Sequence, residues 1–95
     1  MTDLWNTPVS ITPDVLHQEL DGETVLLNLA NESYFGLDQV GTRIWQVLGA
    51  TSSLPEVLTR LLDEYDVAPE QLRVDVERLV TQLVEAGLVS TDSVR

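Results

Sequence analysis

The sequence predicts an α+β fold in which a three-stranded antiparallel sheet is followed by three helices. Two patterns support this prediction: β-rich runs separated by turn signals occupy residues 15–37, and apolar residues at helical spacing occupy residues 39–86. No repeat or linker interrupts them, and 95 residues have room for one domain with a single core. We therefore expect the sheet and the helices to pack as two layers of that domain.

The predicted sheet begins with a hairpin. Residues 15–20 have the length of a strand, Asp21 and Gly22 form a turn signal, and residues 24–29 resume a β-rich run that is apolar on both faces. A second turn leads to a third strand at residues 33–37. Because the run with two apolar faces is the middle strand, the third strand is expected at an edge of the sheet.

Two helices are predicted next. In residues 39–48 the apolar positions follow a 3.6-residue period, and we expect this helix to bury Trp45 and to stop at Gly49. Ser53 and Glu56 have the spacing of a capping box, with a proline in the first turn. This second helix is expected to end near residue 65.

The third helix is predicted to begin at Pro69 and to end before Gly87, which suits the position after a helix C-cap. Residues 1–14 contain two prolines among polar residues, a density that disfavours a regular helix or a central strand. We expect an N-terminal arm at residues 1–14, a domain at residues 15–90 and a C-terminal tail at residues 91–95. The place of Trp5 on this arm stays open between packing on the sheet and contacting a partner.

Charge and composition exclude several classes of function. Sixteen acidic residues stand against five arginines and no lysine, giving a net charge of −11, so we expect neither nucleic acid nor an anionic membrane as a partner. The excess acid favours solubility and, as the functional alternative, a cationic partner. There is no cysteine, no apolar run of bilayer length and no secretory signal pattern at Met1, so a cytoplasmic location is expected.

Catalytic and metal-binding patterns are weak. His17 is the single histidine, and with Glu19 it lacks the partners of a catalytic triad. Asp63, Glu64 and Asp66 lack the spacing of a calcium loop and are interpreted as a solvated helix end. We therefore expect no enzyme activity, no cofactor and no metal site, and any catalysis would come from a partner protein.

The ordered motifs of residues 15–90 resemble a known family. They are residues 22–29, residues 33–38 with Gly41, Ile44 and Trp45, residues 69–72 with Asp75 and Val76, and Leu83 followed by residues 87–89. Together they resemble the PqqD-like chaperones, which are recognition elements for ribosomally made, post-translationally modified peptides. The Tyr-Phe-x-Leu strand before a Gly-x-x-Ile-Trp helix is most similar to the discrete B proteins of lasso-peptide clusters. The resemblance implies a winged-helix-like fold without DNA binding.

The resemblance implies a function and partners. The lasso-type B proteins bind the leader of a precursor peptide and present it to a separate leader peptidase, and the cyclase is a further candidate partner. One alternative is a PqqD-like chaperone for a radical enzyme or another peptide-modifying enzyme. A winged-helix transcription factor would need a basic third helix, but Arg73 and Arg78 are outnumbered there by acids.

A binding site is expected where the third strand and the third helix meet. The open strand edge can accept an extended peptide as a fourth strand, and the helix can form the wall of a groove. The candidate leader-binding residues are Tyr34, Phe35, Leu37, Leu72, Asp75, Val76 and Leu79. The helix leucines and Val76 have a competing role in the core, and only one of the two aromatic residues is expected to face the ligand. Val76→Glu is expected to abolish binding without changing circular dichroism.

Overall fold

The computed structural model describes residues 4–91 and confirms the α+β prediction. A three-stranded antiparallel sheet has the order β2-β3-β4, formed by β2 (Val15–Leu20), β3 (Glu23–Asn28) and β4 (Ser33–Leu37). The predicted third strand, β4, therefore lies at an edge. The middle strand β3 points alternate side chains inward, where Thr24, Leu26 and Asn28 are buried.

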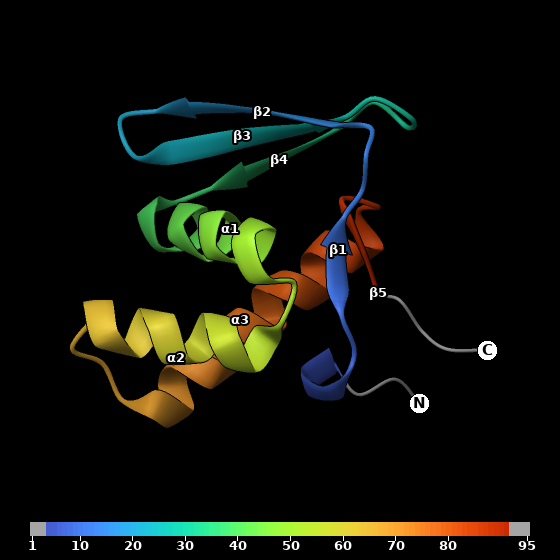
Figure 1. Ribbon diagram of the computed structural model, residues 1–95. Coiled ribbons are helices and arrows are strands. Elements are labelled where there is room, and N and C mark those ends of the chain that lie inside the picture. The colour runs from blue at the N-terminus through green and yellow to red at the C-terminus, as the bar shows by residue number, and fades with distance from the viewer. Residues whose placement is uncertain (1–3, 92–95) are drawn as a thin grey trace.

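Three helices follow the sheet: α1 (Gln39–Thr51), α2 (Leu54–Glu64) and α3 (Pro69–Glu85). They lie on one side of the sheet, and α1 is next to it, with α2 and α3 beyond (Figure 1). The largest fully buried side chains are Leu26, Ile44, Leu48, Leu54, Leu61, Leu83 and Leu88. One core thus joins the sheet to all three helices, and Trp45 is buried in it as expected. None of the described helices is long and apolar enough to cross a bilayer.

The N-terminal segment differs from the expected arm. Within it, η1 (Leu4–Asn6) is a 3₁₀ turn, and β1 (Val9–Ile11) pairs antiparallel with β5 (Val89–Thr91) in a second, two-stranded sheet. The backbone N–H of Val9 donates to the Ser52 carbonyl at 3.0 Å, and its side chain is fully buried. Two prolines flank this strand rather than interrupt it, so proline density did not prevent a short strand. Residues 1–3 and 92–95, the ends of the expected arm and tail, lie outside the described residues.

The first helix continues past its predicted stop. Gly49 lies inside α1, which ends after Thr51, where Ser52 takes a left-handed conformation with φ 62°. A Cβ atom at position 49 would lie 3.3 Å from Cδ1 of Ile11. Glycine at this position therefore provides room for β1 beside the helix instead of ending the helix.

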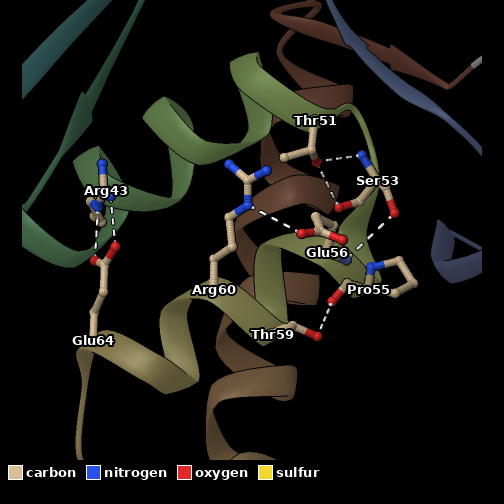
Figure 2. Close-up of polar contacts among 8 residues, drawn as sticks. All are labelled: Arg43, Thr51, Ser53, Pro55, Glu56, Thr59, Arg60 and Glu64. Atoms are coloured by element: carbon tan, nitrogen blue, oxygen red, sulfur yellow. Dashed lines mark hydrogen bonds and ion pairs between the residues drawn. The ribbon is translucent and has the colours of Figure 1, made fainter.

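The second helix begins at the predicted cap, which forms only in part (Figure 2). The Ser53 hydroxyl accepts a hydrogen bond from the N–H of Glu56 at 3.4 Å. The Ser53 N–H donates to the hydroxyl oxygen of Thr51, and the Glu56 carboxylate accepts from Arg60 at 3.2 Å. The reciprocal bond of a capping box is thus replaced by these two contacts.

An ion pair joins the start of α1 to the end of α2 (Figure 2). Arg43 donates two hydrogen bonds to the Glu64 carboxylate, at 2.8 and 2.6 Å. These bonds hold the pKa of the Glu64 carboxyl below its usual range. One acid of the expected solvated cluster at residues 63–66 therefore has a structural partner, while Asp63 and Asp66 are exposed.

The third helix ends in a Schellman motif. The N–H of Leu88 donates to the Leu83 carbonyl, and the N–H of Gly87 donates to the Val84 carbonyl. Gly87 has φ +75°, and its carbonyl accepts a 2.8 Å hydrogen bond from the buried side chain of Asn28 on β3. This contact fastens the end of α3 to the sheet.

Substituting Gly87→Ala should lower the free energy of unfolding by about 2 kcal/mol, because a left-handed alanine is strained and a hydrogen bond is disturbed. The added Cβ would lie 2.9 Å from Nδ2 of Asn28. Urea denaturation would measure the loss. Gly36→Ala is the matched control, since a Cβ atom at position 36 would have nothing within 4 Å and the φ of Gly36 is not positive. Equal losses in the two variants would contradict this account of Gly87.

Candidate functional site

The outer edge of β4 is open. Within residues 4–91, β4 pairs with β3 alone, so its second edge carries backbone groups that have no strand partner. Asp38 follows the strand directly and caps α1, since its carboxylate accepts from the N–H of Gly41 at 2.8 Å. This cap turns the chain from β4 into α1 and so brings the first turns of the helix beneath the strand edge.

A groove of about 540 Å³ runs between this edge and α3. One wall comes from β4 and the beginning of α1, where the lining residues are Phe35, Gly36, Leu37, Asp38, Val40, Gly41 and Ile44. The opposite wall comes from α3, where they are Asp75, Arg78, Leu79 and Gln82. Leu37 and Ile44 are buried, so the groove has an apolar floor.

Charged groups lie on the helix wall of the groove. Asp75 accepts a hydrogen bond from Gln71 at 3.0 Å and lies 3.7 Å from a guanidinium nitrogen of Arg78. Both side chains of this ion pair are substantially exposed, so the pair is weak and either group can turn toward a ligand. Asp38 adds a second carboxylate on the opposite wall.

Four of the seven predicted residues line this groove. Phe35 and Leu37 do so from β4, and Asp75 and Leu79 do so from α3. Phe35 and Leu79 are half-buried and also pack against the core, so each has an exposed part available to a ligand. The expected meeting of the third strand and the third helix is therefore present.

The other three predicted residues do not line the groove. Leu72 and Val76 are buried in the core, and Val76 has no exposed surface. Tyr34 points to the opposite face of the sheet and is 74% exposed, whereas Phe35 points toward the helices. Phe35 rather than Tyr34 therefore lines the groove, and which of the two faces a leader stays a prediction.

Arg78 and Gln82 were missed because α3 has two neighbouring stripes. The core stripe contains residues 72, 76, 80 and 83, and the groove stripe contains residues 75, 78, 79 and 82. At ~100° per residue the centres of the two stripes are about a quarter turn apart. Arg78 lies three residues after Asp75 and Gln82 lies three residues after Leu79, so helical spacing from these two predicted residues would have found both.

The arginines of α3 do not form a basic face. The guanidinium of Arg73 lies 4.2 Å from the ring centroid of Trp5, and the indole N–H of Trp5 donates to Glu77 at 3.3 Å. Arg78 is next to Asp75. Trp5 thus lies against α3, and this helix offers acids beside each arginine, unlike the recognition helix of a DNA-binding protein.

Clusters of metal-ligating side chains are absent from the described part of the chain. His17 and Glu19 lie on the inner face of β2, near Trp45, and the one hydroxyl in the lining of that cavity belongs to Thr24, which is buried. The groove beside β4 is therefore the best-supported candidate site.

Comparisons with known proteins agree with this geometry. The family model of "Coenzyme PQQ synthesis protein D (PqqD)" matches residues 23–89. The solved structure "TbiB1 in Complex with the TbiA(beta) Leader Peptide" is 30% identical with a TM-score of 0.79, covering 90% of this chain and 98% of that chain. "Lasso peptide synthetase B1 complexed with the leader peptide" is 28% identical with a TM-score of 0.77, covering 87% and 98%. No curated protein sequence gives a significant match.

Proposed function

The chain belongs to the PqqD family of recognition elements for ribosomally made, modified peptides, whose members bind peptides and are not catalytic, and we propose that it binds a precursor's leader as a fourth strand beside β4. In this proposal the leader lies in the groove between β4 and α3. The protein then presents the bound leader to a separate lasso-peptide leader peptidase.

The open edge of β4 beside the groove is the observation that carries this proposal. An added strand gains backbone hydrogen bonds from β4 whatever its sequence, and these supply affinity. Its alternate side chains point down toward Phe35, Leu37 and Leu79, which supply selectivity for apolar residues. Both similar solved structures are of proteins with a leader peptide bound, which supports the same role here.

The peptidase is proposed from the similarity to the lasso synthetase component. Members of the family do not catalyse reactions themselves, so cutting the leader requires another protein. Cleavage by a separate protein is compatible with an extended leader. A leader strand paired with β4 would keep the face that points away from the helices accessible to a protease.

A second candidate function is to bind a leader for a different modifying enzyme, such as a radical enzyme. The description of the matching family, which names coenzyme PQQ synthesis, supports this second candidate. This candidate shares the groove and differs in the leader that fits it. Binding of a leader from a radical-enzyme cluster in preference to a lasso leader would favour it.

Fluorescence anisotropy tests the proposed function. A labelled leader from the adjacent precursor gene is titrated with the protein at physiological salt, and a scrambled leader serves as the control. We expect saturable binding at micromolar concentrations or below for the native leader alone, as for a small interface with backbone pairing (about −8 kcal/mol). Equal binding of both peptides, or of neither, would contradict leader recognition.

A further inference from the structure

The helix that forms one wall of the groove is separated by the groove from the opposite wall. The elements that approach α3 most extensively are α2 and β5 rather than β4. The core stripe of α3 is buried by apolar contacts. Because apolar contacts are not directional, they restrict the roll of a helix about its own axis less than hydrogen bonds do. The position of the groove stripe therefore depends on contacts elsewhere on α3.

Trp5 makes directional contacts with the first half of α3. Its indole N–H donates to the Glu77 carboxylate at 3.3 Å, and the guanidinium of Arg73 lies 4.2 Å from its ring centroid. Residues 73 and 77 are about one turn apart, so the ring spans a turn of the helix. The ring is half-buried and also packs against the core. These contacts restrict the roll of α3.

The side of α3 that Trp5 contacts is opposite the groove. At ~100° per residue, residues 73 and 77 are centred about 170° from the groove stripe, and the core stripe lies between the two. Asp75 and Leu79 of the groove stripe lie at nearly the same level along the helix as this contact. A roll of α3 that loosens the contact with Trp5 therefore moves Asp75 and Leu79 relative to β4.

The segment that carries Trp5 is itself attached to the rest of the domain. Its 3₁₀ turn η1 lies beside α2, and the N–H of Val9 donates to the Ser52 carbonyl. The next element, β1, pairs with β5 beyond the end of α3 (Figure 1). This pairing holds the C-terminal end of α3, whereas Trp5 holds its first half from the side opposite the groove. The N-terminal segment thus supports the helix wall at both ends.

We propose that Trp5 is a positioning residue for leader binding, which sets the roll of α3 and thereby the width of the groove. Trp5 does not line the groove, so its effect on the leader passes through α3. This inference rests on the proposed function, because leader affinity is one of its readouts. It assigns a role to the N-terminal segment that the leader-binding residues of β4 and α3 do not include.

Two sets of variants test this role. Trp5→Ala removes the ring, and Arg73→Ala combined with Glu77→Ala removes its partners on α3 without changing the net charge. The matched control is Glu56→Ala combined with Arg60→Ala, which removes an exposed ion pair of the same spacing on α2, outside the groove. Affinity for the labelled leader of the adjacent precursor gene is measured by fluorescence anisotropy, and thermal melting verifies that each variant folds.

We expect Trp5→Ala to weaken leader binding at least about fivefold and the α3 pair at least about threefold, while the α2 control stays within about twofold. Adding the α3 pair to Trp5→Ala should increase the loss by less than about twofold, because both changes remove the same contact. Trp5→Phe keeps an aromatic ring for Arg73 and should recover most of the lost affinity. If Trp5→Ala fails to fold, the α3 pair and Trp5→Phe carry the test.

Nuclear magnetic resonance of the free protein gives a readout that does not need the leader. In nitrogen–proton correlation spectra, Trp5→Ala should shift the amide signals of groove-stripe residues 78, 79 and 82 as well as those of residues 73 and 77. The α2 control should leave the groove-stripe signals in place. Shifts confined to the residues that touch Trp5 would overturn the inference, because the wall of the groove would then not have moved.

The outcomes separate this inference from the function on which it rests. A wild-type protein that binds the leader, with unchanged affinity in the folded Trp5→Ala and α3-pair variants, overturns the positioning role alone. An equal loss in the α2 control, or fully additive losses in the combined variant, also overturns it. A wild-type protein that binds the native leader no better than the scrambled one overturns the proposed function and this inference with it.

Discussion

Replacing Leu79 with glutamate should abolish measurable leader binding, with at least a thirtyfold loss of affinity, or about 2 kcal/mol. Leu79 is the apolar side chain of the α3 wall and faces β4 across the groove. A carboxylate there removes the apolar contact for an inward leader side chain and joins Asp75 one turn earlier on the same wall. A leader residue that enters the groove would then desolvate this charge without pairing it.

Val74→Glu is the control for Leu79→Glu. It adds the same charge to the same helix, but Val74 lies outside the groove. Its leader affinity should stay within about twofold of wild type, as expected for a substitution away from the interface. Both variants are measured by anisotropy, and circular dichroism and thermal melting verify that they fold.

Leu79 also packs against the core, so part of the effect could come from the fold. Leu79→Gln removes the apolar contact without a charge, and it should retain the native melting profile more closely while still weakening the leader at least about fivefold, or 1 kcal/mol. If the folded Leu79→Gln and Leu79→Glu proteins both bound the leader with wild-type affinity, the groove between β4 and α3 would not be the leader site.

The elements that could be predicted are those with local signals. The turn at Asp21 and Gly22, the cap at Ser53 and the glycine at position 87 each act within a few residues, and each lies where the sequence placed it. The order β2-β3-β4 followed from apolar residues on both faces of the middle strand. Strands that are joined by short connections are usually neighbours in the sheet, so their order can be predicted from the sequence.

The two-stranded sheet could not be predicted in the same way. β1 and β5 lie at opposite ends of the chain, and each has only three residues. Their pairing depends on where α1 and α3 bring the chain ends, and therefore on tertiary packing. Gly49 shows the same limit, because its role depends on the approach of Ile11 from β1 rather than on its own helix.

The candidate site was predicted in its location and only in part in its residues. An open third strand beside a third helix followed from the order of elements, but which side of α3 borders the groove depends on the rotation of the helix. The stripe chosen from sequence was centred on the core residues Leu72 and Val76, and it reached the groove at Leu79 and Asp75. Apolarity alone favours the core stripe, since the groove stripe contains charged residues.

The expectation that Val76→Glu would leave the fold intact is therefore revised, and the substitution should unfold the protein. Val76 has no exposed surface. A glutamate there would bury an unpaired carboxylate at a cost of several kcal/mol, against a total stability of about 5–15 kcal/mol for a domain of this kind. Far-UV circular dichroism at neutral pH should show loss of helix, and urea titration should show a large loss of stability.

The pH dependence of Val76→Glu distinguishes a buried charge from simple loss of packing. Burial disfavours the ionised carboxylate, so the pKa of this glutamate would be raised in the folded state relative to the unfolded state. Its contribution is least unfavourable below the unfolded pKa and grows more destabilising as the pH rises through the folded pKa. The stability difference from wild type should therefore shrink on acidification. A difference that is the same at pH 4 and pH 7, or a native spectrum at neutral pH, would contradict the placement of Val76 in the core.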